Sequence, residues 1–421
     1  MLRSVSGLFG LRTCSMVLGL FNGIILARLL GPANFGAYSV ALSLVNFFAT
    51  LALLGIPMLA TRDIAVDAER ERWNRLRGLM RASERWVMFA VLVILGVFSI
   101  LATAIAFDYA VTWIEVLIFA ALVASVSFGQ LRASFLRGLN KVVLADVPEL
   151  FVRPVVGFIL LAAIYVAIGY ASVTLALGVQ ITASGIALVF ISRWLVAKQP
   201  SALKTALPKE LEVRWLMGAL PFLAIGVITT LLGQLSLYIL AYSSGSEQAG
   251  VFQAASQFTT VISVGLVSVN IPMQPRLSVA WAKNDKIELQ RLLTIAARIS
   301  TGFAILAVLG LLVFAEPILL LYGVEYAEGA NALRILAIGQ LFNAMAGACG
   351  VLLSMTGNQV IVMRGTLIAL VANALVGILL IPQLESVGAA IAVAIAIATW
   401  NILFAAYALT KLGLNTTVFR L

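Results

Sequence analysis

Two arginines, Arg62 and Arg276, are the side chains whose type and spacing most favour a chemical role. They lie 214 residues apart, and each closes an apolar segment shortly after a proline: Pro57 in the first case, Pro272 and Pro275 in the second. Guanidinium groups bind phosphate oxygens in pairs, so two arginines at equivalent places favour a diphosphate-binding site. For each arginine alone, the alternative is an ordinary cation that extends from a helix end to the lipid headgroups.

Polar side chains recur on one helical face of two segments that share the same offset. The positions are Ser39, Ser43 and Asn46 in one segment and Gln253, Gln257 and Thr260 in the other. Polar groups inside a membrane are costly and usually face a bundle interior or a water-filled cavity. The amides favour a cavity wall, whereas the serines also fit helix packing. Proline would have to bend the helix end for Arg62 to share this face.

Four more side chains are candidates for the same cavity. Arg12 and Asn22 lie on one face of the apolar segment that precedes the first polar stripe. Arg153 and Arg364 are secondary candidates near the basic ends of later segments. Arginines inside or beside membrane helices often mark a substrate path, so the three arginines are candidates for anion binding, and Asn22 is expected in the cavity wall.

The elements that position these residues are membrane helices. The chain of 421 residues is 62% hydrophobic and only 11% charged, and its apolar runs reach about 20 residues, the length of a helical span. Continuous runs without alternation exclude a barrel. The sequence predicts an all-α membrane protein with twelve spans, at residues 8–30, 36–58, 86–107, 111–131, 147–169, 172–196, 215–242, 248–272, 294–314, 329–355, 360–381 and 387–410.

The distribution of Lys and Arg residues predicts which side of the membrane each connection faces. Of 28 Lys and Arg residues, only Arg28 and Arg334 fall toward the side opposite the basic connections, which predicts a cytoplasmic membrane protein with both termini in the cytoplasm. The two exceptions are expected to line the opposite mouth of the path, or to pair with Glu325 or Glu328. The net charge of +10 then faces anionic lipid headgroups, and no nucleic-acid partner is implied.

One basic connection carries an amphipathic pattern. Residues 68–81 place Trp73, Leu76 and Met80 at helical spacing among arginines. This spacing predicts a helix that lies in the membrane interface.

Several chemistries are excluded or disfavoured. The chain contains no His, so triads and His-bound metals are excluded, and no phosphate-binding loop of nucleotide-hydrolysing enzymes is present. Cys14 and Cys349 fall in apolar segments and match no metal or redox spacing. Connections of at most about 27 residues leave no room for a soluble catalytic domain. We therefore expect no cofactor, no metal and no enzymatic activity.

An internal repeat organises the whole chain. Gly31 and Gly36 recur as Gly245 and Gly250 at the offset of 214 that relates the two arginines. A repeat of half a membrane protein is typical of transporters whose substrate path lies between the halves. The sequence predicts a lobe of six helices at 1–200, a cytoplasmic linker at 201–214 and a second lobe at 215–421, around a central cavity.

Short motifs along the chain resemble the Wzx-type polysaccharide-biosynthesis flippases of the multidrug/oligosaccharidyl-lipid/polysaccharide (MOP) exporter superfamily. The segments that carry the resemblance are 27–38 (Ala-Arg-Leu-Leu-Gly-Pro-Ala-Asn-Phe-Gly-Ala-Tyr), 55–63, 247–252, 321–326, 353–359 and 387–392. The resemblance implies a fold like that of MATE transporters, alternating access, and a substrate of polyprenyl diphosphate carrying an oligosaccharide such as an O-antigen repeat. A polysaccharide polymerase and chain-length machinery are the partners that the family implies, beside membrane lipids.

Other functions remain open from the sequence. A cation-coupled multidrug exporter of the same superfamily would need a carboxylate in a membrane helix, but the first, second and seventh spans have none and the eighth has only Glu247 at its edge. Lipid II flippases resemble the chain more distantly, and Asn22 stands where they commonly carry a cavity arginine. A scaffold that moves nothing is a third class.

Overall fold

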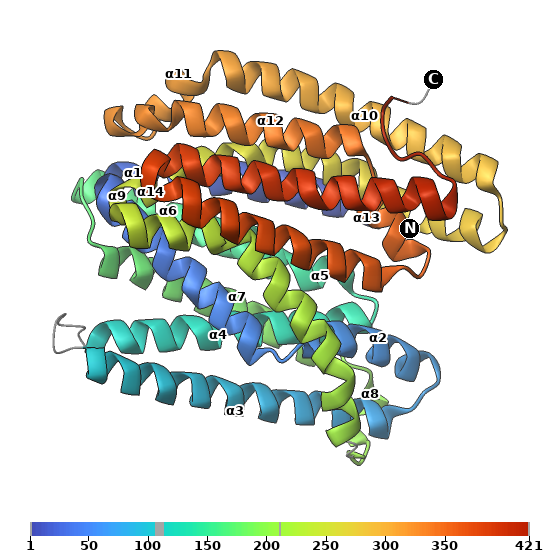
Figure 1. Ribbon diagram of the computed structural model, residues 1–421. Helices are drawn as coiled ribbons and strands as arrows, with labels where there is room; N and C mark the ends of the chain where they lie inside the picture. The colour runs from blue at the N-terminus through green and yellow to red at the C-terminus, as the bar shows by residue number, and fades with distance from the viewer. Residues whose placement is uncertain (1, 106–112, 210–211, 420–421) are drawn as a thin grey trace. The chain divides into compact units, whose positions relative to one another are not determined.

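The computed structural model describes residues 2–105, 113–209 and 212–419, and these ranges are almost entirely helical. The last residues of the third expected span (106–107) and the first of the fourth (111–112) lie outside the described ranges. The helices are drawn in Figure 1. In the first half they are α1 (Leu2–Ala52), α2 (Ile56–Glu69), α3 (Trp73–Ile105), α4 (Trp113–Gly138), α5 (Val142–Val147), the π-helical turn η1 (Pro148–Val152), α6 (Arg153–Ala167), α7 (Val173–Lys198) and α8 (Ser201–Thr205).

The second half contains α9, which is the longest helical assignment with 71 residues, and α14, which has 49. Its elements are α9 (Glu212–Ala282), α10 (Lys286–Val313), α11 (Ala315–Leu320), the 3-10 turn η2 (Val324–Gly329), α12 (Ala330–Ala346), α13 (Cys349–Met355), α14 (Gln359–Tyr407) and the π-helical turn η3 (Ala408–Leu412).

The twelve expected spans are confirmed, although several are joined end to end. Within the described ranges, eight helices are long and apolar enough to cross a membrane, and a bent pair, Val324–Ala346 with Cys349–Met355, forms a ninth. Three of the eight (α1, α9 and α14) are each divided by one non-helical residue, at Gly31, Gly245 and Glu385 respectively. Each division leaves two pieces of spanning length.

The repeat is visible in the backbone. Gly31 has φ 71° and ψ 168°, and Gly245 has φ 87° and ψ 172°. Glycine reaches positive φ without a steric penalty, which explains why both breaks use it. Five residues further on, Gly36 and Gly250 pack together: a Cβ on Gly36 would lie 1.7 Å from the Ser246 carbonyl oxygen. The two copies of the repeat therefore have the same break and meet at the same glycine.

The chain forms two compact units. The terminal unit joins Met1–Val40 to Leu231–Leu421, and the central unit is Ala41–Thr230. In the terminal unit, α12 packs between α10 and α14; in the central unit, α4 packs against α2, α3 and α7 (Figure 1). The division into lobes at 1–200 and 215–421 stays a prediction.

The end of the second span differs from the sequence prediction. The span stops at Ala52 rather than residue 58, because Leu54 (φ 51°) and Gly55 (φ 73°) turn the chain. A new helix, α2, then begins with Pro57 in its first turn, where the missing N–H of proline costs nothing. Gly55 is needed for packing as well, since a Cβ there would lie 2.3 Å from the Ala219 carbonyl oxygen.

The prediction of an interfacial helix at 68–81 is wrong. The helix α2 ends at Glu69, and α3 begins at Trp73 and continues without a break into the membrane span. Leu76 and Met80 are buried in the core of the central unit and do not face lipid. Their helical spacing reflects packing inside the protein, which produces the same apolar pattern as lipid contact.

Two expected spans are irregular. The fifth runs from Val142 to Ala167 through η1, because Pro154 cannot donate the next helical hydrogen bond and the turn before it widens. The tenth is broken at Gly347 (φ 72°), and its two parts are bent by 46°.

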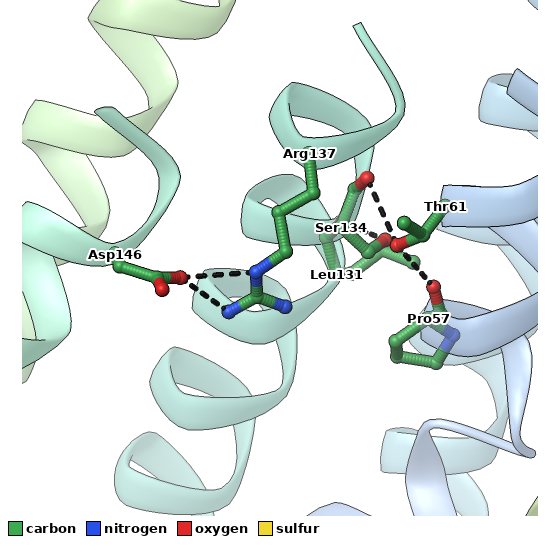
Figure 2. A network of polar contacts seen from close by, with 6 residues as sticks. All are labelled: Pro57, Thr61, Leu131, Ser134, Arg137 and Asp146. Atoms are coloured by element: carbon green, nitrogen blue, oxygen red, sulfur yellow. Dashed lines mark hydrogen bonds and ion pairs between the residues drawn. The ribbon is translucent and has the colours of Figure 1, made fainter. Parts of the chain in front are cut away.

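In the central unit, side-chain hydrogen bonds link α2 to α4 and α4 to α5, as Figure 2 shows. The Thr61 hydroxyl on α2 lies 2.8 Å from the Pro57 carbonyl and 3.3 Å from the Ser134 carbonyl of α4. Arg137 donates from two nitrogens to one Asp146 carboxylate oxygen, at 3.0 and 2.8 Å, which ties α4 to α5. Charged partners make such hydrogen bonds roughly twice as strong as neutral ones.

The expected linker at 201–214 is anchored to α3 where it is described. Arg77 donates to the carbonyls of Lys204 and Ala206 at 2.7 and 2.6 Å. The Lys209 N–H donates to the Asn74 carbonyl at 2.9 Å, and Gly78 leaves room for that crossing. Residues 210–211 of the linker lie outside the described ranges.

Candidate functional site

The second polar stripe contacts the first span inside the terminal unit. A Cβ on Gly23 of α1 would lie 2.0 Å from Oε1 of Gln257 on α9, so the first and eighth spans are in contact there. The same Oε1 accepts a hydrogen bond from the Tyr322 hydroxyl at 2.6 Å. Burial raises the pKa of Tyr322, so the hydroxyl keeps its proton and remains a donor.

Aromatic residues surround this contact. Tyr322, Tyr326 and Phe35 are almost fully buried, and their rings meet edge to face at 5.7 to 6.2 Å. The Tyr326 hydroxyl donates to the Ala27 carbonyl at 3.3 Å. Sequence reasoning from charged and amide groups missed the polar contacts of these tyrosines. The only signal for them was the Leu-Tyr-Gly motif at 321–323.

The rest of the two stripes ranges from buried to exposed. Ser39 and Ser43 are buried, and the Ser39 hydroxyl donates to the Phe35 carbonyl one turn earlier at 2.7 Å. This arrangement fits helix packing. Asn46 and Gln253 are half-buried, and Thr260 is exposed. Asn22 is half-buried on α1.

A matching contact lies in the central unit. Thr50 of the second span lies 3.4 Å from Thr230 of the seventh, hydroxyl to hydroxyl, and a Cβ on Gly226 would lie 3.2 Å from the Thr50 methyl group. The first span therefore contacts the eighth, and the seventh contacts the second. At an offset of 214, the first and second spans correspond to the seventh and eighth. The two contacts are therefore equivalent in the two copies of the repeat.

Arg62 lies on α2, beyond the turn at Leu54 and Gly55. Its side chain is 61% exposed, and Nε lies 2.8 Å from the neighbouring Asp63 carboxylate. The guanidinium carbon lies 5.8 Å from the centre of the Phe222 ring, within range of a cation–π contact. The exposed face of this guanidinium keeps donors free for a ligand.

Three other arginines of the candidate set are exposed. Arg12 on α1, Arg276 on α9 and Arg364 on α14 make no hydrogen bond or ion pair with any group whose placement the structure describes. Arg276 sits inside the continuous α9, which runs on to Ala282. The side chains of Pro272 and Pro275 lie outside what the structure describes.

The two exceptions to the charge rule have structural partners, but not the glutamates considered from the sequence. Arg28 Nε donates to the Leu321 carbonyl at 2.8 Å, just after the end of α11. Arg334 donates to the Leu312 carbonyl near the end of α10 at 3.3 Å, and to Asn331 at 2.9 Å. Helix ends leave carbonyls unpaired and carry partial negative charge, so they attract cations.

The secondary candidate Arg153 is also engaged. It is paired with Glu149 one turn earlier along the chain and lies 3.4 Å from the Gln180 side-chain oxygen on α7. The Glu149 carboxylate therefore compensates the charge of Arg153.

Among the described residues, no group of three His, Cys, Asp or Glu side chains could hold a metal ion.

Solved structures share this fold. An inward-facing multidrug resistance MATE family transporter of the MOP superfamily matches with a TM-score of 0.77 and 15% identity, over 92% of both chains. The lipid II flippase MurJ in an inward closed conformation matches with a TM-score of 0.72 and 15% identity, over 96% of this chain and 87% of that one. A MOP superfamily transporter from Pyrococcus furiosus matches with a TM-score of 0.66 and 15% identity, over 97% and 95%.

A curated relative is similar over part of the sequence. It is the probable low-salt glycan biosynthesis flippase Agl15 of Haloferax volcanii, 25% identical over 162 residues, or 38% of this chain. The match spans about a third (34%) of that relative's length.

Family profiles cover both halves of the chain. The MatE profile matches residues 221–379, which contain the second copy of the glycine break and its polar stripe. The polysaccharide biosynthesis protein profile matches residues 1–281, well over half of the chain. With the MATE-like fold, the repeated glycine breaks and this match, the chain belongs to the polysaccharide biosynthesis protein family, as its sequence motifs predict.

Proposed function

We propose that this protein is a flippase that moves a polyprenyl-diphosphate-linked oligosaccharide across the cytoplasmic membrane by alternating access. Arg12, Arg62 and Arg276 would hold the diphosphate, and the amides Asn46, Gln253 and Gln257 would line the path of the sugars. The protein is a transporter in this proposal and performs no covalent chemistry on the glycan.

The observation that carries the proposal is uncompensated positive charge on the helices of the repeat. Arg12 and Arg276 are exposed and unpaired among the described residues. The helix α1 contains no Asp or Glu, and α9 contains only Glu212 and Glu247. A cationic, carboxylate-poor surface in a membrane protein favours an anionic substrate.

The physical task explains these side chains. A sugar diphosphate headgroup carries hydration that hydrocarbon cannot replace, so its transfer needs polar and cationic partners along the way. Guanidinium groups replace water around phosphate oxygens, and amides do so around hydroxyl groups. The polyprenyl tail would stay in lipid, where its transfer costs nothing.

The proposal also includes the orientation of the chain in the membrane and the roles of its two halves. Both termini would lie in the cytoplasm, because the basic connections are on one side of the predicted topology. The halves 1–200 and 215–421 would alternate in opening the path, and a polysaccharide polymerase with its chain-length machinery would use the delivered glycan. Of the two halves, the first carries more of the cationic candidates.

A cation-coupled multidrug exporter is the second candidate, because the MatE profile matches residues 221–379. The shortage of carboxylates in α1 and α9 disfavours it, since a cationic drug needs a negative site. A lipid II flippase is disfavoured by Asn22, at the place where such flippases commonly carry an arginine.

The test is glycan export in cells. Replacing both Arg62 and Arg276 by Ala should abolish export while membrane insertion and protein level remain normal. Arg70→Ala with Arg291→Ala is the matched control, because both are exposed arginines outside the proposed path. Export at the native level by the Arg62/Arg276 variant would remove these residues from the mechanism.

A further inference from the structure

A basic cavity lies in the central unit, and none of the candidate transport residues lines it. It has a volume of about 350 Å³ and is lined by residues of α3, α4, α7 and α8. Its charged lining consists of Arg77, Arg81, Arg132, Lys204 and the carboxylate of Glu84. The apolar part of the lining comes from side chains on α3, α7 and α8.

The single carboxylate in the cavity lining does not neutralise the positive charge of the four cationic side chains. Arg132 is paired with Glu84 at 3.5 Å and also donates to the Ser192 hydroxyl. Arg77 is held by the neutral carbonyls of Lys204 and Ala206, so its position is fixed while its charge is not neutralised.

Two cations of this cavity are not compensated by the described residues. Arg81 and the Lys204 ammonium group are exposed and have no hydrogen-bond or ion-pair partner in that part of the chain. An anion in the cavity would therefore meet two available cations, with Arg77 fixed nearby.

Three of the helices that form the cavity are candidate membrane spans. The spans that form it start at Trp73 in α3 and end at Gly138 in α4 and Lys198 in α7, so the cavity residues lie close to these boundaries. Trp86 and Trp194 are half-buried next to it in sequence, and tryptophan is enriched at membrane–water interfaces.

An exposed apolar surface continues from the cavity into the span region. Met88 and Leu92 follow Arg81 on the same face of α3, seven and eleven residues on, and are 49% and 59% exposed. Val196 on α7 lines the cavity and is 61% exposed, and Val189 lies two turns earlier on that face, 51% exposed. The helix α4 packs against both α3 and α7.

From this geometry we propose that the cavity binds the phosphodiester headgroup of an anionic phospholipid, whose acyl chains lie along the exposed faces of α3 and α7. Basic pockets between membrane helices favour such headgroups, and each nearby cation strengthens the attraction. A soluble phosphate compound would use the same cations but would gain nothing from the apolar faces. The proposal does not rest on the proposed function.

Lipid retention by the purified full-length protein tests the proposal. Delipidated protein in detergent is titrated with phosphatidylglycerol, phosphatidylcholine or free glycerol phosphate, and binding is followed by native mass spectrometry and by the melting temperature. Phosphatidylglycerol should bind best, and the variant Arg81→Gln with Lys204→Gln should bind it about thirtyfold more weakly, as expected for two lost cations. The control variant Lys286→Gln with Arg291→Gln loses the same charge from exposed positions on α10 and should bind like the native protein.

A gain of binding separates the site from a folding defect. Glu84→Gln removes the carboxylate of the lining and should tighten phosphatidylglycerol binding a few-fold, about the effect of one charge. Equal binding by native protein and the Arg81/Lys204 variant would overturn the proposal. So would equal binding of phosphatidylcholine, or stabilisation by free glycerol phosphate at the same concentrations.

Discussion

Gly36 and Gly250 allow α1 and α9 to approach closely because neither residue has a side chain. A Cβ on Gly250 would lie 2.1 Å from the Pro32 carbonyl oxygen, and a Cβ on Gly36 would meet the Ser246 carbonyl. Both obstacles are backbone atoms, which cannot rotate away as a side chain can. The repeated glycines are therefore structural requirements of the contact, and their spacing along the chain is a consequence of it.

Replacing Gly36 by Ala should destabilise the protein by about 3 kcal/mol, because the added methyl group forces two helices apart. The melting temperature of the purified protein in detergent measures the effect. Gly302→Ala on α10 is the control, since nothing lies within 4 Å of a Cβ there, and alanine favours a helix. Equal melting temperatures for the two variants would show that α1 and α9 are not packed as described.

At single residues, the sequence predicted which types of side chain face inward but not their partners. The spacing identified Gln257 as part of a polar face, but its hydrogen bond comes from Tyr322, 65 residues further along the chain. Charge alone suggested glutamate partners for Arg28, whereas its partner in the structure is a helix-end carbonyl. Backbone carbonyls are present at every residue, so no sequence pattern marks the ones that are available.

Among the helices, hydropathy predicted the spans well and their ends poorly. The turn at Leu54 and Gly55 separates the second span from α2, although the segment is apolar on both sides of it. The basic stretch at 68–81 has an amphipathic pattern, but its apolar residues Leu76 and Met80 are buried in the core of the central unit. Helical spacing of apolar residues shows that one face of a helix avoids water and does not say whether lipid or protein covers it.

The contact between α2 and α3 has a predictable pH dependence. Asp67 on α2 is buried and lies 3.2 Å from Arg75 Nε on α3. Burial raises the pKa of Asp67 above its ordinary value of 3.8, and the charge of Arg75 offsets this only in part. Because the pKa is higher in the folded protein, the stability due to this carboxyl is fully present below about 3.8 and is lost as the pH rises through the raised pKa.

Asp67→Asn should therefore become more stable relative to the native protein as the pH rises from about 4 towards neutrality. The difference between the two melting temperatures, measured in one detergent across this range, reports the effect. A difference that moves in the opposite direction would mean that the ion pair with Arg75 dominates over burial.

In the molecule as a whole, the repeat was predictable and the grouping of segments was not. The offset of 214 correctly relates the breaks at Gly31 and Gly245 and the contacts between the spans on either side. The sequence did not indicate that residues 1–40 group with residues 231–421. Grouping depends on which helices pack side by side, and similar apolar faces along the chain do not specify this.

The orientation of the whole chain in the membrane is testable by labelling. In a variant without its native cysteines, Lys198→Cys and Glu328→Cys place single thiols at exposed positions on opposite sides of the predicted topology. A membrane-impermeant reagent should label position 328 in intact cells and position 198 only after the membrane is opened. Labelling in the reverse order would invert the topology.

Transport by the purified protein in liposomes decides whether it is a flippase. The liposomes carry a fluorescent polyprenyl-diphosphate oligosaccharide in both leaflets, and a membrane-impermeant quencher reports how much of it can reach the outer surface. We expect rapid quenching of nearly all the fluorescence with the native protein, and of about half with the Arg62→Ala/Arg276→Ala variant, with the mass of the glycan unchanged. Half quenching by the native protein as well would show a scaffold that moves nothing, and a changed glycan mass would show an enzyme; either result would contradict the proposed transport.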